Sequence, residues 1–399
     1  MTTTPGRVAV LTLVAAILVA PANASTAAQD LDGTIIKSEK QSVKLEVIAK
    51  GLETPWGMAF LPDGRLLVTE RPGRLRIIDK GTLLPPVKGT PDVWVRQDGG
   101  LFDVEVHPQY AKTGWIYLSY SEVKAGTPAA GRGDGPSVPS MTVIVRGKIK
   151  DNTWIDQQVL FRGTPDLYTV ADLHYGSRFT FDTAGHLFFS LGDKGTPENA
   201  QDLTKPTGKV HRVNDDGSIP KDNPFVNTRG AVGSIWTYGH RNPQGLSWDP
   251  ATGKLWETEH GPTGGDELNL LEAGHNYGWA VVSNGSQPGI TATAKNGMDS
   301  PKAFWTPSIG PAGIAFAAGT TYPGWKNSVF IAALTGQQLR RVEIAKDIVT
   351  HQEVVFKEYG RVRDIIVGPD GYFYVAVSLP GQRVTDTTAG AIVRMIPVK

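Results

Sequence analysis

The stretch AGHLFFSLGD, residues 184–193, is one copy of a phrase that returns along the chain: a turn with Gly or Asn, then a short strand of aromatic and aliphatic side chains. Such strands, bounded by turn residues and not separated by long helical patterns, predict an all-β protein. The other copies are DGRLLVTE (63–70), TGWIYLSY (113–120), TGKLWETEHG (252–261), KNSVFIAAL (326–334) and DGYFYVAVS (370–378).

The six copies are spread over about 360 residues, so each unit has roughly sixty residues, enough for four strands with their loops. A closed ring of such units is a six-bladed β-propeller of four-stranded antiparallel sheets, which is the fold we expect. A β-sandwich is the alternative, but it would not require the same phrase six times. The uneven spacing predicts loop insertions at 124–140 and 283–303. Because no linker divides residues 41–399, we expect a single domain there.

The composition excludes several classes of function. The 399 residues include 40 Lys and Arg against 39 Asp and Glu, so the charge does not indicate a nucleic-acid partner. The absence of cysteine excludes disulfides, thiolate zinc sites, cysteine nucleophiles and cysteine-ligated iron–sulfur clusters. The sequence also lacks a dinucleotide-binding glycine motif, a Walker loop, a serine-hydrolase elbow and an HExxH zinc motif.

The N-terminus is typical of an export signal. Arg7 is the only charged side chain before residue 25, and it precedes the apolar run 8–20. That run is too short to span a bilayer comfortably, and Ala22-Asn23-Ala24 has the small side chains of a cleavage site. We expect a secretory signal over 1–24, an extension over 25–40, and a periplasmic or secreted protein without stable membrane insertion. An uncleaved anchor or a buried helix is the alternative.

His174 and Asp193 form the first of four polar clusters. His174 precedes a Gly-Ser-Arg turn that leads into a strand, and Asp193 follows the next strand in LGDKG. A carboxylate that orients an imidazole makes it a plausible general base near neutral pH. The alternative is a structural histidine.

Two further clusters contain arginine. Arg241 and Asn242 stand before Pro243, which favours an extended or turn conformation, and a guanidinium there suits a carboxylate-bearing ligand. Arg361 and Arg363 lie on one face of a predicted strand, where two like charges are costly unless an anion or acid lies between them. The alternatives are a surface turn for the first pair and bridging by Asp364 or Glu358 for the second.

The fourth cluster, residues 257–279, is rich in oxygen donors. Asp266 and Glu267 follow a Gly-Pro and Gly-Gly loop, and Asn269, Asn276 and Tyr277 come after them. Carboxylate, amide and carbonyl oxygens are the ligands that Ca²⁺ prefers, although the spacing is not that of an EF-hand.

In this order, the clusters resemble those of the soluble pyrroloquinoline-quinone (PQQ)-dependent sugar dehydrogenases, in particular the aldose sugar dehydrogenase branch of the glucose/sorbosone dehydrogenase family. The resemblance covers nearly the whole mature chain and implies a six-bladed propeller. It is carried by GLETPWGMAFLPDGRLLVTERPGRLRI (51–77), GGLFDVEVHP (99–108), YGHRNPQG (238–245), EHGPTGGDELN (259–269), NYGW (276–279) and RVRDIIVGPDGYFYV (361–375).

The resemblance implies the activity and the site. His174 would take the proton of the anomeric hydroxyl of an aldose while hydride leaves C1 for PQQ C5, giving a lactone, and Asp193 would orient His174. The electron acceptor that reoxidises PQQ is not indicated. The remaining implied roles are PQQ binding by Arg241, Asn242, Arg361 and Arg363, an active-site Ca²⁺ on the carbonyls of Gly261 and Pro262, and a structural Ca²⁺ on Glu267 and the Tyr277 carbonyl.

Two positions depart from the family pattern. The family places a cofactor-contacting glutamine directly before the Gly-Leu-Leu turn, whereas here Asp98 stands there and Gln97 is one residue earlier. The resemblance implies that Gln97 binds PQQ from this position; the alternative is that the contact is lost. The family often has a lysine in the fifth unit where this chain has Thr335. Two other functions stay open: a calcium-dependent propeller lactonase, and a binding scaffold without catalysis.

Overall fold

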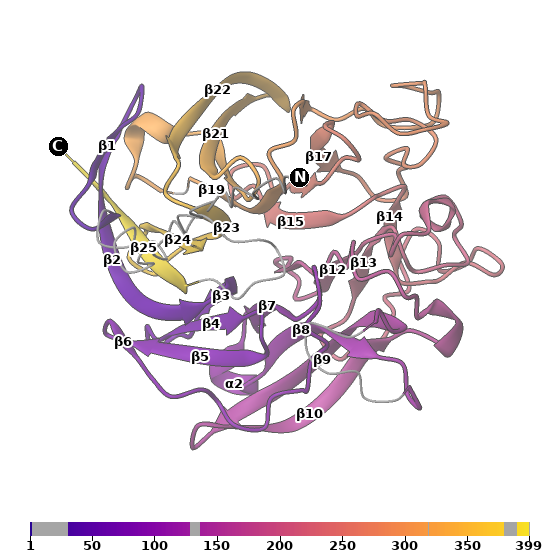
Figure 1. Cartoon of the computed structure of the whole chain (residues 1–399), viewed down its shortest axis with the longest axis horizontal. Helices are drawn as coiled ribbons and strands as arrows, with labels where there is room; N and C mark the ends of the chain where they lie inside the picture. The colour runs from indigo at the N-terminus through magenta and orange to yellow at the C-terminus, as the bar shows by residue number, and fades with distance from the viewer. Residues whose placement is uncertain (2–30, 128–135, 318, 379–388, 399) are drawn as a thin grey trace.

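The computed structural model describes Met1 and residues 31–127, 136–317, 319–378 and 389–398. Six antiparallel sheets are arranged in a ring, which confirms the predicted six-bladed β-propeller (Figure 1). Most of the expected signal segment and part of the 124–140 loop lie outside the described residues. Within the described ranges, no helix is long and apolar enough to cross a membrane.

The first five sheets have four strands each, in chain order from the inside of the ring to the outside. The first sheet contains β3 (Pro55–Phe60), β4 (Leu66–Glu70), β5 (Arg74–Asp79) and β6 (Thr82–Leu83), and the second contains β7 (Leu101–Val106), β8 (Ile116–Val123), β9 (Ser140–Lys150) and β10 (Thr153–Arg162). The third contains β11 (Phe179–Phe181), β12 (Leu187–Leu191), β13 (Lys209–Val213) and β14 (Ile235–Tyr238), and the fourth contains β15 (Pro243–Trp248), β16 (Leu255–Glu259), β17 (Asp266–Leu271) and β18 (Ala303–Trp305). The fifth contains β19 (Pro311–Phe316), β20 (Ser328–Ala333), β21 (Gln338–Ala345) and β22 (Ile348–Lys357).

The sixth sheet joins the two ends of the chain. Its order is β1 (Ile35–Lys37), β2 (Ser42–Glu53), β25 (Ala389–Pro397), β24 (Phe373–Ser378) and β23 (Arg361–Val367). In Figure 1 the indigo β2 lies beside the yellow β25, and their antiparallel pairing closes the ring. This sheet therefore has five strands rather than the predicted four. β1 comes from the expected extension, and it is held because Ile36 and Leu31 are buried in the apolar core.

Each copy of the repeated phrase forms the second strand of its sheet, namely β4, β8, β12, β16, β20 and β24. These strands are buried along most or all of their length. A strand covered on both faces by neighbouring sheets needs a nearly continuous apolar run, which is why this part of the unit is visible in the sequence. The described helical segments are short: α2 (Tyr110–Thr113) and the 3₁₀ turns Pro165–Leu167, Pro197–Ala200 and Pro323–Trp325.

The loops at one end of the ring position the candidate site. Because the first and second strands of each sheet are antiparallel, the start of the innermost strand lies beside the end of its neighbour. Examples are Pro243 opposite Glu259 and Arg361 opposite Ser378. Residues that precede an innermost strand or follow a second strand therefore meet at one end of the ring, here called the site end.

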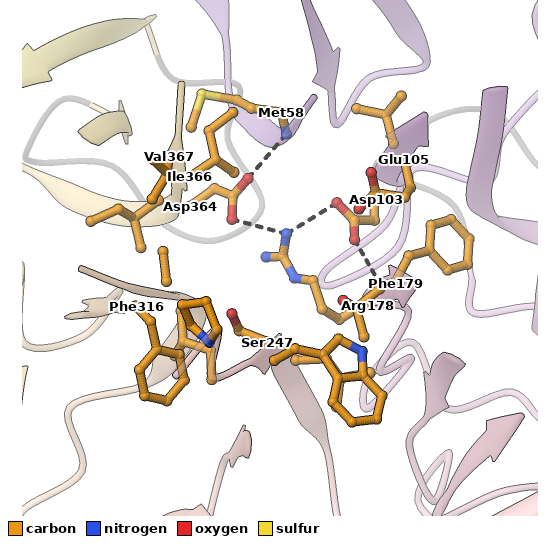
Figure 2. Close-up of a pocket in the computed structure, with 18 residues that line it drawn as sticks. Met58, Asp103, Glu105, Arg178, Phe179, Ser247, Phe316, Asp364, Ile366 and Val367 are labelled. Carbon is orange, nitrogen blue, oxygen red and sulfur yellow. Dashed lines mark hydrogen bonds and ion pairs between the residues drawn. The ribbon is translucent and has the colours of Figure 1, made fainter. Parts of the chain in front are cut away.

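Arg178 lies near the ring axis and ties the innermost strands together (Figure 2). Its guanidinium Nη1 donates to the carboxylates of Asp103 at 3.0 Å and Asp364 at 2.9 Å, and its Nε donates to the Gln244 carbonyl at 2.9 Å. Burial raises the pKa of Asp103 to about 7, against the effect of the Arg178 charge. The cluster borders a cavity of about 270 Å³ in the middle of the ring.

The expected insertion at 283–303 lies between β17, which ends at Leu271, and β18, which begins at Ala303. It is part of a long connection that passes over the site end, because Trp279 there donates to Asp193.

Candidate active site

His174 and Asp193 are in direct contact, as the sequence predicts. The imidazole Nδ1 lies 2.7 Å from Asp193 Oδ1, and the Asp193 side chain is fully buried while that of His174 is 15% exposed. Trp279 Nε1 donates to the other carboxylate oxygen at 2.8 Å, and the Gly195 amide donates to the first at 2.9 Å. A carboxylate only accepts, so Nδ1 carries the ring proton and Nε2 is left as the basic nitrogen.

The backbone around His174 explains the glycines of the motif. His174, Gly176 and Ser177 all have left-handed φ angles, of 52°, 64° and 83°. A Cβ on Gly192 would lie 2.1 Å from the His174 carbonyl oxygen, so the strand end that carries Asp193 can approach only without a side chain there. The two glycines thus allow the close contact of the two loops.

Arg241 and Asn242 lie beside this pair, before β15. The Asn242 side chain accepts a hydrogen bond from the Gly176 amide at 3.1 Å, and the Arg241 carbonyl accepts one from the Asp193 amide at 2.9 Å. Arg241 Nη1 donates to the His260 carbonyl at 3.2 Å. Its Nε is buried and has no hydrogen-bond partner among the described residues, and burial lowers its pKa.

Arg361 and Arg363 begin β23 at the same end of the ring. No ion pair or side-chain hydrogen bond restrains Arg361 within the described part of the chain. Arg363 donates to Gln244 Oε1 at 2.6 Å, and its guanidinium lies 5.3 Å from the centre of the Trp56 ring. Burial first, and the charge of Arg361 next, lower the pKa of Arg363 to about 9. The alternative of bridging by Asp364 is wrong, because Asp364 binds Arg178.

Asp98 contributes a negative charge near these cations. Its charge raises the pKa of Arg241, Arg361 and Arg363 against the effect of burial, so it lies within electrostatic range of all three. The Gln97 side chain is exposed, and its carbonyl accepts a hydrogen bond from an arginine after β4, Arg71. The exposed side chain gives no support to the prediction that Gln97 reaches the cofactor site.

The loop with Gly261 and Pro262 is held by Asp266. The Asp266 carboxylate accepts hydrogen bonds from the amides of Gly261 at 2.9 Å, Ile309 at 2.7 Å and Gly310 at 2.8 Å, and from the Ser308 hydroxyl at 2.7 Å. These donors occupy both oxygens, so Asp266 shapes the loop. Gly261 and Pro262 line a small cavity with Arg241, Glu267 and Tyr277.

Three glutamates surround that cavity or lie next to it: Glu257 and Glu259, which are buried, and Glu267, which is half-buried. One Asn269 amide nitrogen is the donor to all three, at 3.1, 3.4 and 3.2 Å. Burial first, and the charge of Glu259 next, raise the pKa of Glu267 to about 8. Glu257 Oε1 and Asn269 Oδ1 are buried without partners in the described structure. A cation beside Glu257 and Asn269 would satisfy these oxygens. The nearby cavity lined by Glu259 and Glu267 has about 20 Å³, enough for one small ion or water.

Sequence reasoning missed Glu257, Glu259 and His240, whose ligand atoms lie within 4.8 Å of one another. A signal was present, because Glu257 and Glu259 alternate on one face of a strand that has the apolar phrase of a buried element. It also missed His260, whose Nδ1 lies 3.4 Å from the Asn242 amide nitrogen. Thr335, where the family often has a lysine, is exposed.

Residues 52–386 match the family model described as glucose/sorbosone dehydrogenase. The chain belongs to this family. It is 37% identical over 367 residues to the aldose sugar dehydrogenase of Escherichia coli, covering 89% of this chain and 93% of that protein.

Solved structures of this family have the same fold. The apo form of the soluble aldose sugar dehydrogenase from Escherichia coli matches with a TM-score of 0.80 and 36% identity, covering 89% of this chain and all of that one, 100%. The PQQ-bound form of the aldose sugar dehydrogenase from Streptomyces coelicolor matches with a TM-score of 0.71 and 28% identity, covering 90% of this chain and 99% of that one.

The residues present fit an anionic quinone. Arg241, Arg361 and Arg363 are desolvated, lack carboxylate partners in the described part of the chain, and come from segments that meet at the site end. Three such guanidiniums repel one another, and a ligand with several carboxylates would relieve this repulsion. A glucose/sorbosone dehydrogenase chain with this donor set is therefore suited to a polyanionic cofactor.

Proposed function

We propose that this chain is a PQQ- and calcium-dependent aldose dehydrogenase that oxidises the sugar at C1 to the lactone. The observation that carries the proposal is the His174–Asp193 pair, 2.7 Å apart, at the same end of the ring as three guanidiniums that form no ion pair with the described residues. The names of the relatives support the substrate class and the cofactor. The apolar N-terminal run supports export to the periplasm or the exterior, with removal of residues 1–24.

The proton chemistry belongs to His174. Because Asp193 accepts a hydrogen bond from Nδ1–H, Nε2 is free to take the proton of the C1 hydroxyl. The imidazolium that results is stabilised by the adjacent carboxylate. Trp279 and the Gly195 amide hold that carboxylate in place, so the basic nitrogen has a fixed direction. This arrangement is complete before any ligand binds.

The remaining residues would hold the cofactor and the ions. When bound, PQQ would accept the hydride from C1, and the active-site Ca²⁺ would polarise the quinone carbonyl. Arg361 and Arg363 would pair with the carboxylates of PQQ, while Arg241 and Asn242 would bind the quinone edge. The Gly261 and Pro262 carbonyls would hold the active-site ion, and Glu267 with the Tyr277 carbonyl, joined by Glu259, would hold a structural Ca²⁺.

The cation-rich site disfavours the lactonase alternative, because a hydrolytic metal site does not require several desolvated guanidiniums. The oriented imidazole disfavours the scaffold alternative, since a binding module has no use for a fixed basic nitrogen. Neither alternative is supported by a specific contact at the site end.

Reconstitution tests the proposal. Protein incubated with Ca²⁺ and PQQ should reduce a dye with aldoses as donors, and His174→Ala should lose at least about 100-fold in kcat while PQQ still binds. The matched control is His351→Ala, an exposed histidine on β22, which should keep full activity. No dye reduction with a broad panel of mono- and disaccharides would count against the proposal, as would an active His174→Ala protein.

A further inference from the structure

Lys194, the residue after Asp193, is a buried lysine that the proposed chemistry does not use. It is 2% exposed and forms no ion pair within the described ranges. Its ammonium instead donates to the carbonyls of Ala171 at 2.5 Å and Leu173 at 3.3 Å. The same nitrogen lies 3.3 Å from the centre of the Tyr175 ring. All three partners belong to the segment that carries His174.

That segment requires such restraints. His174 has a left-handed φ of 52°, a conformation that costs a non-glycine residue free energy unless the surroundings impose it. One restraint after His174 is the hydrogen bond from the Gly176 amide to Asn242. Before it, Trp94 donates to the Asp172 carboxylate, and the ammonium of Lys194 holds the carbonyl directly preceding His174.

Burying this ammonium is costly, because backbone carbonyls and an aromatic face replace water. Burial lowers the pKa of Lys194 to about 7, although Asp172, Asp98 and Asp193 favour the charged form. A charged side chain that is buried at such a cost, for contacts with two backbone carbonyls and one aromatic ring of this segment, indicates that the position of the segment matters.

We propose that Lys194 is a positioning residue for His174: its ammonium fixes the 171–175 backbone so that the imidazole Nδ1 meets Asp193 and Nε2 faces the substrate. The inference rests on the proposed role of His174 as the base. The contact between His174 and Asp193 can be measured without cofactor or sugar. The positioning role of Lys194 and the role of His174 as the base can therefore be refuted separately.

The direct test is nitrogen NMR of the His174 ring in the cofactor-free protein, at a pH where the ring is neutral. The wild-type protein should show a protonated Nδ1 and an unprotonated Nε2. In Lys194→Met this single tautomer should give way to a mixture of both. Lys194→Gln should also lose the single tautomer, because its side chain is one bond too short to reach both carbonyls. It serves as the test variant if Lys194→Met does not fold.

The chain offers a matched control in Lys209. It is also fully buried, and its ammonium donates to the carbonyls of Asn199 at 2.6 Å, Ala200 at 3.0 Å and Thr207 at 2.9 Å, all remote in sequence from His174. Lys209→Met should lower the unfolding temperature and leave the His174 signature unchanged. The proposal would be overturned if a folded Lys194 variant kept the single Nδ1-protonated tautomer of His174. It would also be overturned if Lys209→Met lost that tautomer to the same extent as the Lys194 variants.

Kinetics of the loaded enzyme give a second test. Because Lys194 touches neither sugar nor cofactor in the proposed arrangement, Lys194→Met should lower kcat by about 10- to 100-fold and change KM and PQQ affinity by no more than about twofold. An unchanged kcat, or a loss confined to PQQ affinity, would contradict a role in positioning His174. If the wild-type protein reduces no dye while the NMR signature still depends on Lys194, only the proposed dehydrogenase function fails.

Discussion

Asp98 places a negative charge within range of Arg241, Arg361 and Arg363, the residues that we propose bind an anion. In the cofactor-free protein this charge offsets the repulsion among the guanidiniums. In the loaded protein the same charge repels the carboxylates of the cofactor. Asp98 therefore stabilises the cofactor-free site and weakens cofactor binding, and removal of its charge should change both properties.

We predict that Asp98→Asn binds PQQ about 3- to 10-fold more tightly, because a repulsion on the order of 1 kcal/mol across partly exposed groups is removed. The same change should lower the unfolding temperature of the cofactor-free protein. Fluorescence titration with PQQ and thermal unfolding measure the two effects. Asp92→Asn, an exposed position on the same segment, is the control. Weaker PQQ binding by Asp98→Asn would show that the carboxylate helps to hold the ligand.

His211 illustrates how burial at a single residue affects stability. Its ring stacks on Phe189 at a centroid distance of 4.8 Å, and its Nε2 lies 2.8 Å from the Pro206 carbonyl oxygen. Burial lowers its pKa to about 3. In the unfolded chain the ring binds a proton near pH 6.5. Its contribution to stability is therefore fully present above pH 6.5 and is lost as the pH falls from there toward 3.

We predict that His211→Gln weakens the acid sensitivity of folding. Between pH 6 and pH 4 the free energy of unfolding of the parent should fall more steeply than that of the variant, by up to about 1.4 kcal/mol per pH unit. Urea unfolding at several pH values measures the two slopes. The exposed His351, changed to Gln, should leave the slope as in the parent. Parallel curves for His211→Gln and the parent would contradict the prediction.

At the scale of the elements, ring closure depends on β2. This strand pairs with β25 from Val43 opposite Pro397 to Glu53 opposite Ala389, so the first and last strands of the ring are hydrogen-bonded partners. Without β2, β25 would present an unpaired edge, and the core around Leu45 would open. β1 adds less, because it covers only the outer edge of β2.

We predict different outcomes for two truncations. A chain that begins at Gln41 should fold with a lowered unfolding temperature, because it loses Leu31 and Ile36 from the core but keeps β2. A chain that begins at Thr54 should give no cooperative thermal transition by circular dichroism. Equal midpoints for the two chains would show that ring closure does not require β2.

The sequence predicts the second strands and the site motifs for physical reasons. LFFSL in β12 is buried at every position, so its apolar run is nearly continuous, and glycines such as Gly192 mark the close approach of two loops. By contrast, Arg178 binds partners 75 and 186 residues away, which no local pattern indicates. Glu257 and Glu259 also escaped prediction, because acids on alternate positions usually face water and only the assembled sheet buries them.

At the scale of the whole molecule, a polar axis supports the site. Gln244 joins two layers of it: its carbonyl accepts from Arg178, and its side-chain oxygen accepts from Arg363. Trp56 lies against both guanidiniums, at 4.5 Å from Arg178 and 5.3 Å from Arg363. The buried cluster that holds the innermost strands together thus also fixes one of the cations at the site end, so packing of the ring and geometry of the site are linked.

The most direct test of the account is calorimetric titration of the calcium-loaded protein with PQQ. We predict binding of one PQQ per chain, an affinity that falls with added salt, and a loss of at least about tenfold in Arg361→Ala, whereas the exposed Arg229→Ala binds as the parent does. The account would be contradicted if PQQ released no heat on titration, or if Arg361→Ala bound it with the affinity of the parent.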